Sequence, residues 1–205
     1  MKGRAEATRV LALRDCAEVL PGFSIPGRLL HDSKGTHQVI STRHLGDGVP
    51  YVYEPQHELR IAPRRDTAPY EVRRTDVVFM SRGTQNRAWV IDRTPQPTIA
   101  SVSFYILRPR EGVDGGYLAW YLNQAPAQAA IAQLRTGAGT PLVQRDAFQS
   151  IQVVLPPLQV QREVARLGVL LAQERDLRHQ LADAVGRAHG ALGVGIIKTL
   201  RNHHV

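Results

Sequence analysis

A run of polar side chains between Ser81 and Arg87 has the residue types needed to hydrogen-bond planar and anionic partners. The run consists of Ser81, Arg82, Gly83, Thr84, Gln85, Asn86 and Arg87. Arg forms bidentate contacts with guanine edges and Asn or Gln with adenine edges, whereas Ser and Thr bind phosphate oxygens. The run therefore predicts a loop that contacts nucleic acid through Ser81, Arg82, Thr84, Gln85, Asn86 and Arg87. A polar hairpin loop with no ligand is the alternative interpretation.

Basic side chains elsewhere in the sequence extend this prediction. The chain has 26 Lys and Arg residues against 18 Asp and Glu residues, which gives a formal net charge of +8. Such an excess favours a polyanionic partner, with nucleic acid first. Arg64 and Arg65 lie in an Arg-rich stretch that Asp66 and Glu71 interrupt, and Arg43 follows a short apolar run. We predict DNA contacts for Arg43, Arg64 and Arg65, with a solvated basic surface as the alternative.

The usual motifs of catalysis are missing from the sequence. Pro156 and Pro157 lack the polar residue before them and the aromatic residue after them that an adenine methyltransferase motif requires. The sequence contains no GxxxxGK[ST] phosphate loop and no GxSxG elbow, and its carboxylates are scattered. Cys16 is the only cysteine, and the eight histidines do not have metal-ligand spacing. We therefore expect no catalytic residue, no metal and no cofactor in this chain.

The apolar stretches of the chain are short. None approaches the length of a transmembrane helix, and the N-terminus lacks the charged-then-apolar order of a signal peptide. We therefore expect a cytoplasmic protein with no membrane partner.

Short β-branched and aromatic runs indicate strands through the first part of the chain, because Gly, Pro, Asn and Asp separate them. The expected strands are Val39–Thr42, Val49–Tyr53, Val77–Met80, Ala88–Ile91, Val102–Leu107 and Ile151–Leu155. Asp114 is typical of the N-cap of a helix through Tyr117–Leu122. Pro126 is typical of the first turn of a second helix, which ends before Gly137. We expect one mixed α/β domain over residues 1–155.

One long helical pattern follows Pro156-Pro157, which no strand or helix ladder readily accommodates. Positions 167, 170, 174, 177, 181, 184, 188 and 191 are Leu, Leu, Glu, Leu, Leu, Ala, Ala and Ala, the spacing of a heptad seam. A helix of roughly 30 residues is about 45 Å long, which favours a coiled coil over packing on its own domain. We expect this helix over residues 156–190, with Leu167, Leu170, Leu177 and Leu181 in the seam. A Gly-rich tail over residues 191–205 is expected to follow.

The order of several segments along the chain is itself informative. They are Asp15–Phe23, Gln38–Leu45, Asp76–Phe79 followed by Ser81–Gly83, Tyr117–Leu122, Gln128–Leu134, Gly137–Pro141 and Ile151–Gln161. In this order they resemble the target-recognition domain of the specificity subunits of type I restriction–modification systems. The last segment is the most specific, since its Leu155–Leu158 run and Gln161 are similar to the family's LPPL-x-x-Q junction. The resemblance covers roughly residues 11–185.

The resemblance implies an α+β protein, in which a compact mixed α/β target-recognition domain precedes one long C-terminal helix. Family members usually contain two such units, whose helices form an antiparallel coiled coil, whereas this sequence contains one. We therefore expect a homodimer that binds a palindromic bipartite site in double-stranded DNA. The expected partners are a methyltransferase (M) subunit, which would bind S-adenosylmethionine and flip the adenine, and a restriction (R) motor-nuclease subunit.

Two other classes of protein stay open at this stage. One is a scaffold or remnant that binds the methyltransferase subunit without recognising a DNA sequence. The other is a small nuclease with an unfamiliar site. The polar run at Arg82–Arg87 favours the specificity subunit over the scaffold.

Overall fold

The computed structural model describes residues 7–46 and 49–202, which form two compact units, one up to Val169 and one from Leu170 onward. The strands are β1 (Arg9–Ala12), β2 (Ala17–Pro21), β3 (His37–Ile40), β4 (Tyr51–Val52), β5 (Arg60–Ile61), β6 (Val77–Met80), β7 (Ala88–Arg93), β8 (Thr98–Ala100), β9 (Phe104–Pro109), β10 (Arg135–Thr136), β11 (Leu142–Val143) and β12 (Gln152–Leu155). The helices are α1 (Leu13–Cys16), α2 (Gly115–Leu122), α3 (Ala125–Gln133), α4 (Arg145–Gln149) and α5 (Leu158–Asn202).

A five-stranded sheet lies at the centre of the first unit and has a hydrophobic core on each of its faces. The strand order is β2-β9-β6-β7-β4, with β6 antiparallel to both β7 and β9. Successive side chains of a strand point to opposite faces of its sheet. Val77 and Phe79 of β6 accordingly pack in one core. Val78 packs in the other, together with Phe104 and Ile106 of β9.

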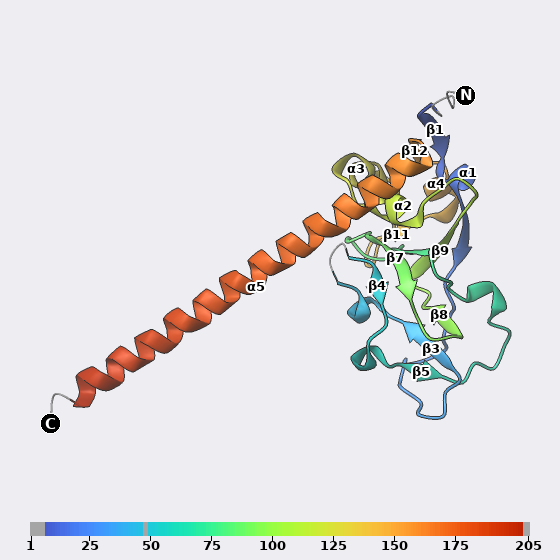
Figure 1. Ribbon diagram of the computed structural model, residues 1–205. Helices are drawn as coiled ribbons and strands as arrows, with labels where there is room; N and C mark the ends of the chain where they lie inside the picture. Colours follow the sequence, from blue (N-terminus) through green and yellow to red (C-terminus); the bar gives the residue numbers. More distant parts are fainter. Residues whose placement is uncertain (1–6, 47–48, 203–205) are drawn as a thin grey trace. The chain divides into compact units, whose positions relative to one another are not determined.

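Helices cover one face of this sheet and a second sheet covers the other. The helical core contains the fully buried side chains of Leu118, Leu122, Ile131 and Phe148. On the opposite face, the three-stranded sheet β5-β3-β8 contributes Ile40 and Ala100 to the second core. Figure 1 shows α2 and α3 on one side of the five-stranded sheet and β3, β5 and β8 on the other. The expected mixed α+β class, with a long C-terminal helix, is confirmed.

Contacts between the two ends of the first unit complete its packing. β1 pairs antiparallel with β12, so that Arg9 lies opposite Leu155.

Asp114 caps α2 as predicted, because its Oδ1 accepts a hydrogen bond of 2.9 Å from the backbone N–H of Tyr117. Gly168 of α5 lies against the ring of Trp120, where a larger residue would collide with the indole.

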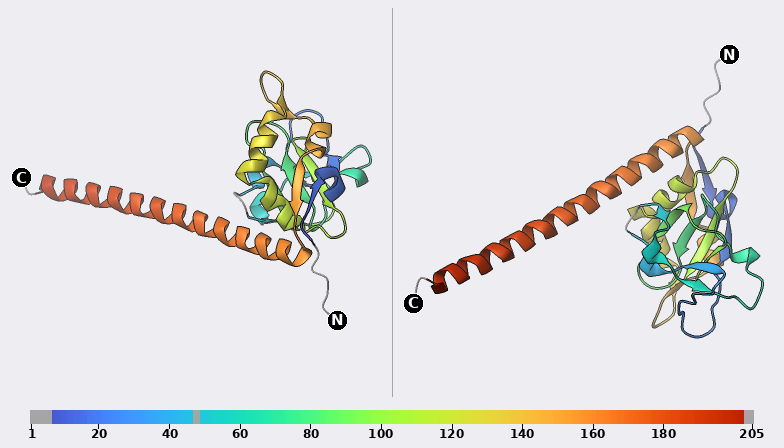
Figure 2. Two further views of the ribbon diagram at one scale, coloured as in Figure 1. Left: turned by 90° about the horizontal axis from the view of Figure 1, so that it is seen from above. Right: turned by 60° about the horizontal axis from the view of Figure 1, so that its bottom comes forward.

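Several predicted element boundaries were wrong. β4 and β9 begin two residues after the expected Val49 and Val102. The strand expected over Val39–Thr42 ends at Ile40, because Thr42–His44 forms a 3-10 turn capped by Ser41. The long helix does not end near residue 190 but continues to Asn202, and Figure 2 shows it unbroken in both views. Glycines suggested a tail there, yet the apolar residues among them keep helical spacing, which offsets a cost of about 1 kcal/mol for each glycine. Residues 203–205 of the expected tail lie outside the described residues.

Candidate nucleic-acid interface

The polar run from Ser81 to Arg87 forms the loop of the hairpin between β6 and β7. The strands pair as far as Phe79 and Ala88, and the backbone N–H of Met80 then donates to the carbonyl of Arg87 at 2.8 Å. Gly83 has a φ of 87°, a left-handed conformation that glycine adopts without steric cost. The strand-and-turn pattern of the sequence therefore predicted the position of this loop correctly.

Burial divides the side chains of this loop into two groups. Arg82, Thr84 and Gln85 are exposed, whereas Ser81 and Asn86 are 1% and 0% exposed. Arg87 is half-buried and interacts with other parts of the protein. The exposed side chains are the ones available to an external partner.

The two buried side chains stabilise the loop from within. Ser81 Oγ donates to the carbonyl of Ser103 at 3.0 Å, and Asn86 Nδ2 donates to the carbonyl of Met80 at 2.9 Å. A side chain that is buried and hydrogen-bonded inside its own domain does not reach a base edge or a phosphate. Ser81 and Asn86, for which DNA contacts were expected, are therefore turned inward in this structure.

Sequence reasoning missed two residues, one in α3 and one in β10, that bind Asn86. Gln128 of α3 donates through Nε2 to the carbonyl of Asn86 at 2.8 Å. Arg135 of β10 donates through Nε to Asn86 Oδ1 at 2.7 Å. Both partners are more than forty residues away along the chain. No local pattern could have identified these long-range contacts.

Arg43 lies on the 3-10 turn that follows β3, beside a small aromatic cluster. Arg43 is exposed, and its Nε lies 3.2 Å from Nε2 of the buried His44. The ring of His44 stacks on that of His57 with a centroid separation of 5.3 Å, and His57 in turn stacks on Tyr51. Burial, followed by the charge of Arg43 and the proximity of His57, lowers the pKa of His44 to about 4. His44 is therefore neutral at physiological pH and presents Arg43 at the surface.

Arg64 and Arg65 lie at the three-stranded sheet, whereas Ser81–Arg87 extends from the five-stranded sheet. Both arginines are exposed. The guanidinium carbon of Arg65 is 4.4 Å from the ring centre of Phe23, and its Nη2 donates to the carbonyl of Ser24 at 3.2 Å. Arg65 is thus engaged in a cation–π contact. The structure does not place these two arginines in one cluster with the 81–87 loop.

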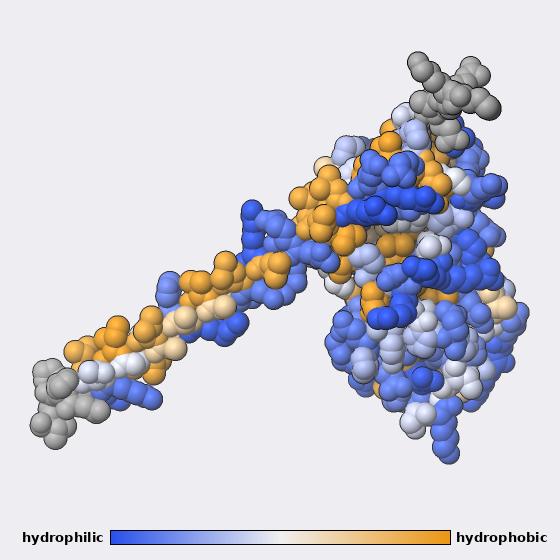
Figure 3. Space-filling view, in the orientation of Figure 1, coloured by the Kyte–Doolittle hydropathy of each residue, from blue (hydrophilic) through white to orange (hydrophobic). Residues whose placement is uncertain are grey.

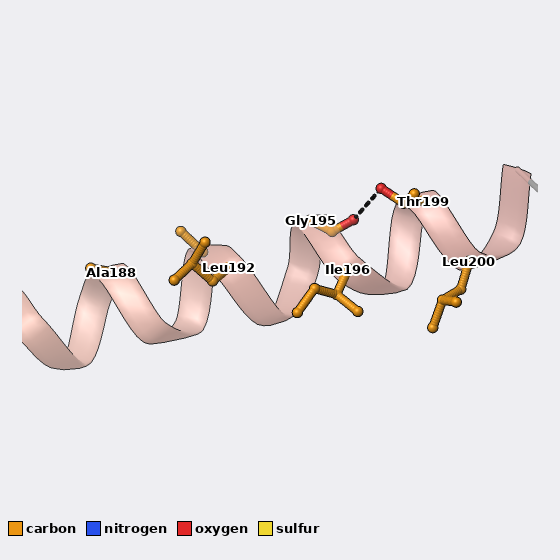
Figure 4. A pocket seen from close by; sticks show the side chains of 7 residues that line it. Ala188, Leu192, Gly195, Ile196, Thr199 and Leu200 are labelled. Atoms are coloured by element: carbon orange, nitrogen blue, oxygen red, sulfur yellow. Dashed lines mark hydrogen bonds between the residues drawn. The ribbon is translucent and has the colours of Figure 1, made fainter.

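The predicted seam residues of α5 form part of an exposed apolar surface. Leu167, Leu170, Leu177 and Leu181 are between 55% and 65% exposed. Apolar groups recur along the helix in Figure 3. Beyond the expected end of the helix, Leu192, Ile196 and Leu200 project from one side of it and help to line a shallow apolar depression (Figure 4). This apolar surface extends almost to the end of α5.

Features of other functional classes are not found in the described part of the chain. Among residues 7–46 and 49–202, no three His, Cys, Asp or Glu side chains come together as a metal site. None of the described helices combines the length and apolar character needed to cross a bilayer.

Comparison with known proteins shows similarity in structure. No protein-family profile and no curated protein matches the sequence. The HsdS subunit of Thermoanaerobacter tengcongensis matches with a TM-score of 0.57 and 18% identity, over 85% of this chain and 40% of that one. The S subunit of a type I restriction–modification system from M. genitalium matches with a TM-score of 0.52 and 9% identity, over 82% and 39%. A chain from a structural study of type I restriction–modification complex assembly has a TM-score of 0.63 and 16% identity, over 89% and 43%.

These matches define the class of fold. The chain has the fold of a type I specificity subunit, and the resemblance detected in the sequence is confirmed at that level. The chain spans between 39% and 43% of the length of these subunits.

Proposed function

We propose that this protein is a non-catalytic specificity subunit that selects the DNA sequence at which a partner methyltransferase acts. The observation that carries this proposal is the exposed trio Arg82, Thr84 and Gln85 on a loop whose buried residues hold its shape. A guanidinium, a hydroxyl and an amide at one loop are the groups that bind guanine, phosphate and adenine. The net charge of +8 adds a sequence-independent attraction to DNA.

The helix α5 supports a homodimer, because its seam changes in size along its length. The first half of the seam has Leu167, Leu170, Leu177 and Leu181, and the second half has Ala184, Ala188, Ala191 and, one step further, Gly195. In a parallel pair, leucines would face leucines and then alanines would face alanines, which would leave an uneven separation between the helices. In an antiparallel pair, most leucines of one helix would instead face an alanine or glycine of the other. This pairing of a large with a small residue suits a constant separation between the two helix axes.

The same size pattern defines a register for the two helices. If Leu181 lies opposite Ala184 of the second copy, then Leu177 lies opposite its Ala188 and Leu170 opposite its Gly195. The two-fold axis then passes between positions 181 and 184. A dimer with this axis would bind a palindromic site in two halves separated by a fixed spacer.

The proposed assembly needs partners for its chemistry. The methyltransferase subunit would bind S-adenosylmethionine and methylate an adenine that it flips out of the duplex. A restriction subunit with motor and nuclease activity is the further expected partner.

The experiment that tests the function is methylation mapping of host DNA by long-read sequencing. The chain is co-expressed with its methyltransferase subunit, and that subunit alone is the control. Methylated adenine in a split palindrome, present only with this chain, is the expected result. A methylated motif that is not palindromic would contradict the homodimer. No new motif despite co-purification of the two proteins would instead identify a scaffold or remnant. Metal-dependent nicking of plasmid by the purified chain alone would identify a nuclease.

A further inference from the structure

A β-hairpin late in the chain is hydrogen-bonded to the 81–87 loop through the backbone. Strands β10 and β11 pair antiparallel, with Thr136 opposite Leu142. The backbone N–H of Gly83 donates to the carbonyl of Pro141 at 2.8 Å, and that of Val143 donates to the carbonyl of Ser81 at 2.9 Å. The loop and the hairpin are therefore one structural unit, although they are far apart in the sequence.

Arg135, the first residue of the hairpin, adds side-chain bonds to the same unit. Its Nε donates to Asn86 Oδ1 at 2.7 Å and its Nη2 to the carbonyl of Thr84 at 2.6 Å. Two donors of one planar guanidinium thus bind two points of the loop, a geometry that the single ammonium of a lysine does not reproduce. Arg135 is half-buried. It constrains the backbone on both sides of Gln85, one of the exposed residues of the loop.

The outer surface of the hairpin has groups that suit a DNA backbone. Residues 136–140 at its tip are exposed, as are Gln144 and Arg145, which follow β11. The tip has the sequence Thr136-Gly137-Ala138-Gly139-Thr140. Its small side chains allow close approach, and hydroxyl and backbone N–H groups bind phosphate oxygens.

Arg82 and Arg145 both lie close to β11 of the hairpin: Arg82 forms an isolated antiparallel bridge with Leu142, and Arg145 follows Val143 by two residues. Tyr105 donates through its hydroxyl to the carbonyl of Val143 at 2.8 Å, at the base of the hairpin. Burial raises the pKa of this tyrosine, the charges of Arg145 and Arg82 oppose that rise, and the charge of Asp146 adds to it. Two exposed arginines, Arg82 and Arg145, therefore flank the base of the hairpin.

We propose that the β10–β11 hairpin and the Arg82–Gln85 segment form one DNA-contacting surface in which Arg135 and Arg145 have different roles. Arg145 contacts a phosphate, whereas Arg135 is a positioning residue that fixes the loop and does not contact DNA. The inference rests on the proposed function, because it assigns roles within the same recognition surface.

The test uses the full-length chain and two kinds of duplex. Wild-type protein first selects a preferred sequence from a random duplex pool, and a scrambled duplex of the same composition serves as the comparison. Affinity for both duplexes is then measured over a range of salt concentrations for Arg135→Gln, Arg135→Lys and Arg145→Gln. Arg162→Gln, an exposed arginine in the first turns of α5, is the matched control.

The two roles predict different changes in sequence preference and in the salt dependence of binding. Arg135→Gln should reduce the preference for the selected duplex about tenfold or more and leave the salt slope unchanged, with Arg135→Lys in between. Arg145→Gln should weaken binding to both duplexes equally and reduce the salt slope by about one. Arg162→Gln should match wild type.

Several outcomes would overturn this assignment. An equal loss on both duplexes with a smaller salt slope for Arg135→Gln would make Arg135 a phosphate contact. An unchanged preference in Arg135→Gln would remove its positioning role. An unchanged salt slope in Arg145→Gln, whose exposed position makes misfolding a minor concern, would remove the hairpin from the surface. If wild-type protein selects no sequence at all, the proposed function itself fails.

Discussion

The side-chain oxygen of Gln161, in the first turn of α5, accepts a hydrogen bond of 2.9 Å from the backbone N–H of Asp114, the residue that caps α2. The amide nitrogen of Gln161 donates to the carbonyls of Gly112 and Pro156 at 3.0 and 2.8 Å. Gln161 is 1% exposed. One buried side chain therefore connects the start of the long helix to the start of α2. This contact gives a physical meaning to the glutamine of the LPPL-x-x-Q junction.

Replacing Gln161 should destabilise this junction. Gln161→Leu keeps the size of the side chain but leaves the N–H of Asp114 and two carbonyls without partners. We expect the free energy of unfolding to fall by about 1–3 kcal/mol in denaturant titrations. Gln159→Leu, at an exposed position two residues earlier, is the control and should change stability by less than about 0.5 kcal/mol. Equal stability of the two variants would show that the junction does not depend on Gln161.

Loss of a buried Arg–Asp ion pair should lower the free energy of unfolding more than loss of an exposed Arg–Asp pair. Arg108 Nη2 lies 3.0 Å from Asp76 Oδ2, and the side chains are 24% and 3% exposed. In the exposed pair, Arg74 Nε lies 3.5 Å from Asp92 Oδ1, with side chains 78% and 50% exposed. Asp76→Asn should cost about 3 kcal/mol, because it leaves a partly buried guanidinium without its charge partner. Asp92→Asn should cost less than about 1 kcal/mol. Thermal unfolding that ranks the two variants in the reverse order would contradict this assignment.

The lowered pKa of His44 should make stability depend on pH in a defined range. The two ring nitrogens face two N–H donors, Ser41 N at 3.3 Å and Arg43 Nε at 3.2 Å. A neutral ring accepts from one of them, and a protonated ring accepts from neither. A histidine whose folded pKa is about 4 contributes its full stability above the unfolded pKa of about 6.5. That contribution is lost as the pH falls from about 6.5 to about 4, by about 3 kcal/mol in total.

His44→Asn tests this dependence, because its amide oxygen can accept from Ser41 without titrating. Denaturant titrations from pH 4 to pH 8 should show a smaller loss of stability with acidification in this variant than in wild type. His31→Asn replaces an exposed histidine and should keep the wild-type pH profile. A wild-type acid response in His44→Asn would mean that other groups cause it.

Truncation of Arg82 should change which bases are selected. Its guanidinium is exposed on the 81–87 loop, so Arg82→Ala should cost about 1–3 kcal/mol of discrimination at the contacted base pair. Selection from a random duplex pool measures this as relaxed preference at one position of the motif. Arg28→Ala, an exposed arginine of a different loop, should keep the wild-type motif. Uniform weakening on all sequences would make Arg82 a phosphate contact instead.

Local signals were sufficient for much of the fold but not for the site. The β-branched and aromatic run Val77–Met80 and the capping residue Asp114 are properties of a few adjacent residues, and both predictions were confirmed. The inward direction of Asn86 depends on Arg135, which no local pattern connects to it. The same residue type serves at the surface or in the interior, so composition indicated a polar loop without showing which side chains face outward.

The end of α5 shows a second limit of local reasoning. Gly193 and Gly195 suggested a tail because each glycine weakens a helix. The apolar surface, however, continues through Leu192 and the residues beyond it. Helical periodicity over the whole segment was the stronger signal.

The proposed antiparallel pairing of α5 predicts which engineered cysteines can form a disulfide between two copies. Burial raises the pKa of Cys16, the one native cysteine, to about 11, and its side chain is 0% exposed, so this thiol should stay unreactive at neutral pH. In the proposed register Leu177 faces Ala188 of the second copy. Leu177→Cys combined with Ala188→Cys should therefore give a disulfide-linked dimer on mild oxidation, measured by non-reducing electrophoresis.

Single variants distinguish the antiparallel pair from its alternatives. Leu177→Cys alone should stay uncrosslinked, because the same position of the second copy lies on the far side of the two-fold axis, whereas a parallel pair would bring the two introduced thiols together and link them. Leu170→Asp with Leu181→Asp places four carboxylates in the proposed dimer seam and should give a monomer in light scattering, since a desolvated charge there has no partner. A wild-type monomer, or a dimer that tolerates both aspartates, would mean that the leucine face of α5 does not form the dimer interface.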